Sequence, residues 1–123
     1  MFTIDPMSRT PVYGQIIEQV EKFIALGILK PGDAMPSVRN LSVELSVNPN
    51  TIQKTFNELM SRGLTVSVPG KGSFISQDAP ELIKNKSRAK LDDFKLLVKE
   101  LHTAGLTIEE IGQAVKDAVS EME

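Results

Sequence analysis

Apolar residues recur at helical spacing along most of this chain, and the residues between them indicate where helices start and stop. The first helical stretch opens at Thr10-Pro11, with Thr as N-cap and Pro at the first helical position, and it ends at Gly27. A second helix is predicted to follow the N-cap Ser37. A third is predicted from Asn48-Pro49 to about Arg62, where Gly63 stops it.

After the third helix the pattern changes from helical spacing to alternation. Apolar residues occupy every second position of residues 64–68, which predicts a strand, and residues 73–76 are predicted to form a short return strand. Residues 69–72, Pro-Gly-Lys-Gly, form the turn between them. Three helices followed by a hairpin with a basic tip is the element order of a winged helix-turn-helix. Residues 1–9 are expected to add either a brief strand or an arm lying on the first helix.

The rest of the chain reads as a helical tail. A long fourth helix is predicted from Pro80 to about Thr103, and Thr107 with Glu110 forms a capping box that opens a fifth helix. Two amphipathic helices of this length bury little on their own, and a second copy of the chain is the simplest surface for them to cover. The positions assigned to this dimerisation surface are Leu91, Phe94, Leu97, Val98, Leu101, Ile108, Ile111, Val115 and Val119.

These elements define an expected fold class and domain organisation. The class is mainly α with a small β-hairpin. Residues 1–78 are expected to form a winged helix-turn-helix domain, and residues 79–123 a two-helix C-terminal dimerisation tail.

The predicted third helix has two opposed faces. Ile52, Phe56 and Leu59 follow the i, i+4, i+7 spacing of one apolar stripe. The opposite face carries amides and one cation: Asn50, Gln53, Lys54 and Asn57. Such side chains suit reading base edges and contacting phosphates. An ordinary solvated helix is the alternative, although it more often carries Glu and Lys, and the flanking chain has to decide between the two.

Charge and composition narrow the classes of function. The formal net charge of the 123 residues is -2, and residues 1–78 contain seven Lys or Arg against seven Asp or Glu, so a DNA surface has to be a local patch. No cysteine is present, which excludes disulfides, thiolate metal sites and cysteine nucleophiles. The N-terminal residues lack the pattern of a signal peptide, and no stretch is apolar enough to span a membrane. A cytoplasmic location is compatible with these features.

The glycine-flanked lysine of the hairpin turn could suggest a nucleotide-binding loop. That motif requires an earlier glycine and a following helix, whereas here Lys71 is followed by Gly72 and a strand. A hairpin tip whose backbone approaches a groove while Lys71 meets a phosphate fits better. A plain surface turn is the alternative.

No catalytic constellation is visible elsewhere. His102 is the only histidine, and it has no second histidine or cysteine with which to complete a common zinc site. Adjacent acidic pairs at residues 92–93 and 109–110 are read as solvated helix faces. We therefore expect neither an enzyme nor a bound cofactor or metal. Four cations spread around the start of the tail, Lys84, Lys86, Arg88 and Lys90, are read as a solvated helix start, with contact to the DNA backbone as the alternative.

Several linked segments carry a resemblance to a known family. They are Pro11-Val12-Tyr13-Gly14-Gln15-Ile16, residues 27–33, Pro36-Ser37-Val38-Arg39-Asn40-Leu41, Val47-Asn48-Pro49-Asn50-Thr51 and residues 70–75. In register from about residue 3 to residue 76, they resemble the DNA-binding domain of GntR-family bacterial transcription regulators. The short tail resembles the YtrA subfamily. This resemblance implies a homodimeric repressor whose C-terminal helices pair the subunits, with inverted-repeat operators often near genes for membrane transporters.

The resemblance also assigns residues to DNA contact. The positions are Ser37, Arg39, Asn48, Pro49, Asn50, Thr51, Gln53, Lys54, Lys71 and Gly72. One departure is that Val68-Pro69 stands where the family's wing usually has a basic residue before the glycine pair. The wing should therefore bind phosphate more weakly and depend more on Lys71.

The predicted function is a sequence-specific DNA-binding transcription regulator whose partners are a double-stranded DNA operator and a second copy of the chain. No membrane partner is expected, and a small-molecule effector is left open. The competing hypothesis is a winged-helix adaptor that binds proteins and has lost DNA binding. The charge balance of residues 1–78 favours that alternative, whereas the amide-rich face of the third helix argues against it.

Overall fold

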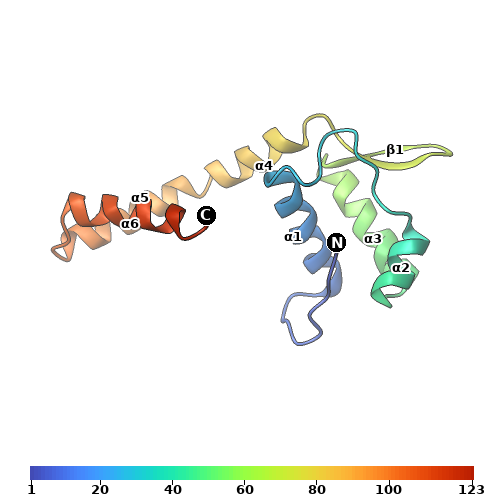
Figure 1. Ribbon diagram of the computed structural model, residues 1–123, viewed down its shortest axis with the longest axis horizontal. Coiled ribbons are helices and arrows are strands. Elements are labelled where there is room, and N and C mark those ends of the chain that lie inside the picture. Colours follow the sequence, from blue (N-terminus) through green and yellow to red (C-terminus); the bar gives the residue numbers. More distant parts are fainter. The chain divides into compact units, whose positions relative to one another are not determined.

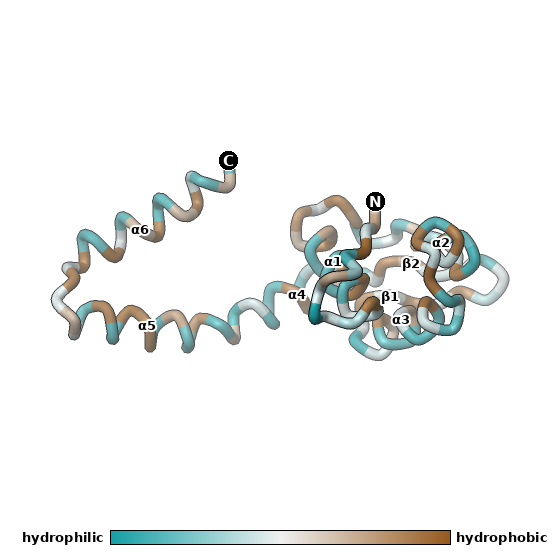
Figure 2. Tube along the Cα trace, turned by 90° about the horizontal axis from the view of Figure 1, so that it is seen from below, coloured by the Kyte–Doolittle hydropathy of each residue, from teal (hydrophilic) through white to brown (hydrophobic).

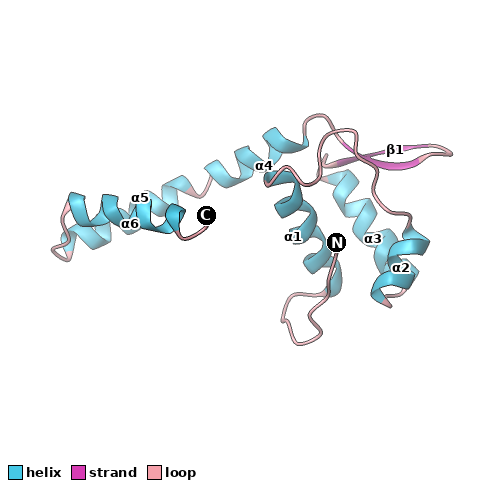
Figure 3. Cartoon of the chain, viewed as in Figure 1, coloured by secondary structure: helices cyan, strands magenta, loops and turns pink.

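The computed structural model describes all residues, 1–123, as six helices and one two-stranded antiparallel sheet (Figure 1). In chain order the elements are α1 (Val12–Ala25), α2 (Val38–Leu45), α3 (Pro49–Ser61), β1 (Thr65–Val68), β2 (Gly72–Ile75), α4 (Ala79–Arg88), α5 (Leu91–Thr103) and α6 (Ile108–Ser120). They divide into two compact units, the N-terminal unit (residues 1–85) and the C-terminal unit (residues 86–123), each described by itself below. The predicted class, mainly α with a small hairpin, is confirmed (Figure 3).

The core of the N-terminal unit lies where α3 packs against α1, α2 and β1. Ile16 of α1, Leu41 of α2 and Ile52 of α3 have no exposed surface at all. Phe56 and Leu59 are also buried, which confirms the predicted apolar stripe of the third helix. The opposite face of α3 is therefore turned away from the core by geometry, because residues one helical half-turn apart point in opposite directions.

The sequence predicts most of the helix ends correctly. Gly27 and Gly63 follow α1 and α3 with φ values of 74° and 79°, a left-handed conformation that glycine adopts without strain. The residue after each glycine bonds back to the last turn of the helix: Ile28 N–H donates to Phe23 O at 2.8 Å, and Leu64 N–H donates to Leu59 O at 3.0 Å.

The predicted cap at Thr10 is wrong. The N-cap position of α1 is Pro11, and no side chain caps this helix. The side-chain amide of Gln15 reaches back to Thr10 O at 2.9 Å, so the Thr10 segment is held by a glutamine of α1 instead of starting the helix itself.

The hairpin pairs β1 with β2 antiparallel, with Val66 opposite Phe74. The loop before α2 adds to its other edge, since Met35 N–H donates to Ser73 O and Ile75 N–H donates to Asp33 O, both at 2.8 Å. The strands are confirmed, but the apolar side chains of β1 do not all face the core: Val66 is 47% exposed, whereas Thr65 is buried. Only the base of the hairpin is covered by helices, so its outer half extends into solvent.

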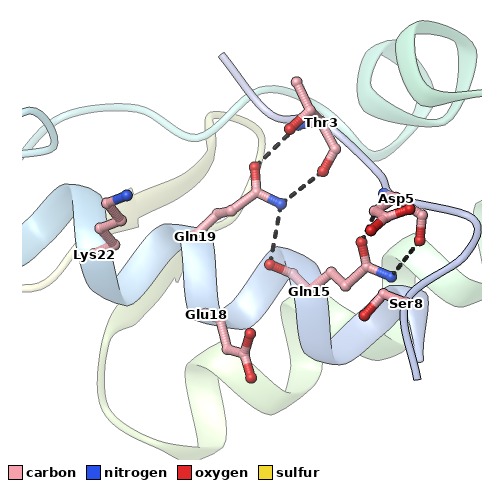
Figure 4. Close-up of a pocket in the computed structure, with 7 residues that line it drawn as sticks. All are labelled: Thr3, Asp5, Ser8, Gln15, Glu18, Gln19 and Lys22. Atoms are coloured by element: carbon pink, nitrogen blue, oxygen red, sulfur yellow. Dashed lines mark hydrogen bonds between the residues drawn. The ribbon is translucent and has the colours of Figure 1, made fainter. Parts of the chain in front are cut away.

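The N-terminal residues form an arm on α1, which decides between the two predicted possibilities. Phe2 is buried, with its ring 5.5 Å from that of Phe23. Two glutamines of α1 bind the arm's backbone as a neighbouring strand would: Gln19 receives a bond from Thr3 N–H at 2.9 Å, and Gln15 receives one from Asp5 N–H at 2.8 Å (Figure 4). Each amide also donates back to the same residue's carbonyl. An open groove of about 370 Å³ runs beside these contacts.

The predicted fourth helix is wrong in one respect, because the chain breaks it into α4 and α5 at residues 89–90. Ala79 and Ile83 of α4 are buried, whereas no residue of α5 is. Lys86, in the last turn of α4, lies four residues before Lys90, a like-charge spacing that disfavours a continuous helix. The compact N-terminal unit thus extends through Asn85, beyond the predicted boundary at residue 78.

The C-terminal unit is a helical hairpin of α5 and α6. Thr107 caps α6 by accepting from Glu110 N–H at 3.1 Å, which confirms the predicted N-cap. The Glu110 carboxylate accepts from the Thr107 hydroxyl at 3.4 Å, so the second half of the capping box differs from the prediction. No residue of either helix is buried, and apolar and polar positions alternate along both (Figure 2). An apolar groove of about 240 Å³ lies between them, lined by Phe94, Leu97, Val98, Leu101, Leu106, Glu110, Ile111, Ala114 and Val115. None of the helices in the chain has the length and apolar character that crossing a membrane requires.

Candidate nucleic-acid interface

The outer face of α3 is polar and exposed to solvent. Asn50, Gln53, Lys54 and Asn57 are all exposed. The Gln53 side-chain amide donates to Asn57 Oδ1 at 3.0 Å, so these two amides are aligned along the helix and leave further donors and acceptors pointing outward. The face therefore has the hydrogen-bonding chemistry that base edges require.

The start of α3 is built by Asn48 and Pro49, as predicted. Asn48 Oδ1 accepts from Asn50 N–H at 2.7 Å, and Pro49 occupies the first turn. This cap uses the side-chain oxygen of Asn48 and leaves its Nδ2 group free to donate. Thr51 is half-buried, and its N–H donates to Asn48 O at 3.0 Å, so it is the least accessible of the predicted contact residues.

A tight turn joins α2 to α3 and fixes their relative orientation. Ser46 ends α2 in the left-handed region with φ 54°, the only non-glycine residue of the chain with positive φ. The buried Ser42 hydroxyl donates to Val47 O, and Val47 N–H donates to Ser42 O at 3.1 Å. This reciprocal pair closes the turn of the helix-turn-helix.

Arg39 lies in the first turn of α2, exposed and one residue past Val38. Ser37 caps this helix by accepting from Asn40 N–H at 3.0 Å, as predicted. The Ser37 oxygen is therefore committed to the cap, whereas the Arg39 guanidinium projects from a helix whose start is well defined.

The hairpin tip carries one cation. Lys71 and Gly72 are exposed, and Lys71 N–H donates to Val68 O at 2.9 Å across the turn. Gly70 and Gly72 both have positive φ, 75° and 114°, which explains why the turn needs glycine on each side of Lys71. Val68 and Pro69 are exposed but uncharged.

All ten predicted contact residues lie in the N-terminal unit, and only Thr51 is not exposed. Exposure is necessary for contact with DNA, but which of them touch DNA stays a prediction. One residue that the sequence reasoning did not select is Tyr13 of α1, whose ring lies under the Lys54 ammonium, with 4.5 Å from Nζ to the ring centroid. The only feature of the sequence that could have indicated Tyr13 is its place in the family-like segment Pro11–Ile16.

No group of three or more His, Cys, Asp or Glu side chains is arranged to hold a metal ion. The charged groups near α3 that do pair are structural: Arg62 bonds Glu21 of α1 at 3.1 Å and Glu58 of its own helix at 3.0 Å. These pairs tie α3 to α1 at the end away from Asn48.

Comparison with known proteins identifies the architecture. Residues 12–75 match the family described as bacterial regulatory proteins, gntR family. The chain is 38% identical over 118 residues to the HTH-type transcriptional repressor YtrA of Bacillus subtilis (strain 168), an alignment that covers 95% of this chain and 91% of that protein.

Solved structures agree with this assignment. A transcriptional regulator from Oenococcus oeni has a TM-score of 0.73 at 28% identity, covering 94% of this chain and 97% of that one. The DNA-binding domain of AraR in complex with an operator has a TM-score of 0.55 at 30% identity, covering 62% of this chain and 96% of that one. Family members are regulators, which agrees with the prediction that the chain is not an enzyme. The chain therefore belongs to the gntR family of bacterial regulatory proteins and carries the winged helix-turn-helix of a DNA-binding transcription regulator.

Proposed function

We propose that this regulator is a homodimeric repressor that binds an inverted-repeat operator, with α3 of each copy in the major groove. The observation that carries the proposal is the exposed amide face of α3 directly after the Asn48 cap. A helix of this kind fits the major groove, and its amides can bond to adenine and other base edges. The similarity to the AraR DNA-binding domain, which was solved in complex with an operator, supports operator binding by this unit.

Three further features are assigned roles in this docking. Arg39 contacts a base or a phosphate from α2, and the positive end of the α3 dipole lies where a phosphate is favoured. Lys71 and Gly72 at the hairpin tip meet the backbone or the adjacent minor groove. With no other cation on the hairpin, the tip contributes less to affinity than α2 and α3 do.

Dimerisation is proposed to use the C-terminal unit. Leu97 is 52% exposed and lines the apolar groove between α5 and α6, while Ile108 and Val119 are more exposed still. A groove lined almost entirely by apolar side chains is stabilised when another apolar surface removes it from water. A second copy of the same hairpin supplies such a surface by symmetry, and it would bring two recognition helices to one operator.

The regulated genes are proposed to be those of a membrane transporter, as the YtrA-like resemblance implies. No effector is assigned. A winged-helix adaptor that binds protein is the alternative function, favoured by the equal numbers of acidic and basic residues in residues 1–78.

Selection from a random DNA library by the purified full chain separates these functions. The regulator is expected to recover a palindromic sequence with two half-sites about one helical turn apart, because two symmetry-related α3 helices would read it. The same selection with Asn50→Ala/Gln53→Ala is the matched control and should lose base preference. Recovery of no palindrome by the wild-type chain would leave the adaptor as the better proposal.

A further inference from the structure

The Lys54 side chain has a neighbour that the proposed docking does not require. Lys54 is the only charged residue among Asn50, Gln53, Lys54 and Asn57 of α3, and its Nζ lies 4.5 Å from the centroid of the Tyr13 ring. Tyr13 belongs to a different helix, α1, and the two helices pack together through the core. The contact therefore joins the predicted recognition helix to a residue far away in the sequence.

The two partners differ in mobility. Tyr13 is half-buried against the core and has only two side-chain torsions, and the next turn of α1 buries Ile16 and Ile17. Lys54 is exposed and has a flexible four-carbon stem. The ring is thus the fixed member of the pair, and the position of the ammonium follows from it.

We propose that Tyr13 is a positioning residue for DNA binding that holds the Lys54 ammonium ready to contact a backbone phosphate. The inference rests on the proposed function, since it assumes that the outer face of α3 meets DNA. A ring face attracts a cation without neutralising it, whereas a carboxylate partner would cancel the charge. An ammonium has three N–H donors, and the ring occupies only one side of it, which leaves donors for a phosphate oxygen.

Holding the ammonium in place favours binding for an entropic reason. A free lysine side chain loses rotamer freedom when it binds a phosphate, and a lysine already held on a ring loses less. α1 would then contribute to affinity without touching DNA itself.

The test is a double-mutant cycle in the full chain. Fluorescence anisotropy would measure affinity for a labelled duplex carrying the sequence selected by the wild-type protein, at several salt concentrations. The variants are Tyr13→Phe, Tyr13→Leu, Lys54→Met and the double variant Tyr13→Leu/Lys54→Met. Lys22→Met, an exposed lysine elsewhere on α1, is the matched control and should bind as the wild type does.

The proposal makes a distinct pattern of expected results. Tyr13→Leu should weaken binding about threefold to tenfold and Tyr13→Phe less than about twofold, because phenylalanine keeps the ring. Lys54→Met should make the slope of log affinity against log salt concentration shallower, by the amount expected for about one lost phosphate contact. Adding Tyr13→Leu to Lys54→Met should change affinity no further. An equal loss from Tyr13→Leu in both backgrounds, or an equal loss from Tyr13→Phe and Tyr13→Leu, would overturn the proposal.

A second measurement needs no substitution. In the wild-type chain the Lys54 methylene protons should show a ring-current shift in NMR spectra, and the shift should persist when the selected duplex is added. Its disappearance on DNA binding would mean that Lys54 leaves the ring, which overturns the proposal. A wild-type chain that selects no DNA would overturn both this inference and the proposed function, whereas selection without Tyr13–Lys54 coupling would overturn this inference alone.

Discussion

The N-terminal and C-terminal units use the same kind of amphipathic helix with opposite results. In the N-terminal unit Ile16, Leu41 and Ile52 have no exposed surface. In the C-terminal unit no residue of α5 or α6 is buried, although their apolar residues are spaced just as regularly. The difference lies in what each helix packs against within its own unit: α3 packs against α1, α2 and β1, whereas α5 packs against α6.

This difference shows what a hydrophobic pattern means physically. The pattern says which face of a helix is apolar, but the stabilisation comes from the surface that covers this face. The N-terminal unit contains that surface within one chain. The C-terminal unit does not, and we infer that its stability depends on the second copy proposed above.

Ile52→Ala should have the largest effect. Removing a fully buried side chain from the centre of α3 should lower the free energy of unfolding by about 2–5 kcal/mol. Tyr13 is the only tyrosine and the chain has no tryptophan, so tyrosine fluorescence in a urea titration reports the N-terminal unit alone. Leu97→Ala is the matched change in the C-terminal unit and should leave the tyrosine transition in place. Equal shifts from both would mean that the two units unfold as one.

Leu97→Glu should have the next largest effect, on association instead of folding. A carboxylate in the groove would have to lose water on dimerisation, so we expect the dimer dissociation constant to rise by about 30-fold or more, roughly 2 kcal/mol. Sedimentation velocity over a range of concentrations measures this. Leu96→Glu is the control, because Leu96 is adjacent and similarly exposed, 58% against 52%, but does not line the groove. If both variants stay dimeric, the groove is not the interface.

Arg39→Ala should weaken operator binding by about 1–3 kcal/mol if the guanidinium reads a base. If the guanidinium contacts only phosphate, the slope of log affinity against log salt concentration should also become shallower, by the amount expected for about one lost contact. Anisotropy titrations with the selected duplex provide both quantities. Lys99→Ala removes a cation from the C-terminal unit and should change neither quantity. Unchanged affinity on removing Arg39 would exclude this residue from the interface.

Asn48→Ala should lower the stability of the N-terminal unit by about 1 kcal/mol through loss of the α3 cap. Thr107→Ala removes the equivalent cap of α6 and should leave the tyrosine transition unchanged. Asn48→Asp keeps the cap but adds a negative charge, so it should retain stability and weaken DNA binding. Urea titrations and anisotropy separate the two roles, and undiminished binding by Asn48→Asp would place Asn48 away from DNA.

Ser46→Gly should have the smallest effect, a gain of less than about 1 kcal/mol in the stability of the N-terminal unit. Ser46 adopts φ 54°, which glycine tolerates without strain, although glycine also has more freedom to lose on folding. The melting temperature would measure the gain. Ser61→Gly, in the last turn of α3, is the control and should be destabilising. A loss of stability from Ser46→Gly would mean that the turn is not strained.

Much of the N-terminal unit could be predicted from sequence because its signals are local. Asn48 and Pro49 start α3, Gly63 ends it, and the spacing of Ile52 and Leu59 determines which face is buried. Each of these depends on residues within a turn or two of one another. The exposed amide face of α3 follows from the same spacing.

Features that involve residues far apart in the sequence needed the tertiary structure. The arm's place on Gln15 and Gln19 could not be separated from a strand by pattern, because it depends on side chains that meet across helix and arm. Likewise, only the structure shows that Ala79 and Ile83 of α4 are buried in the N-terminal unit while α5 buries nothing.

The contact between Tyr13 and Lys54 is the clearest case of this division. The sequence determined that Lys54 lies on the outer face of α3, because a residue two positions after the buried Ile52 points to the opposite side of a helix. Only the packing of α1 on α3 decided that an aromatic ring lies beneath its ammonium. Local spacing determines the direction in which a side chain points, whereas the neighbour that it meets depends on how the helices are packed.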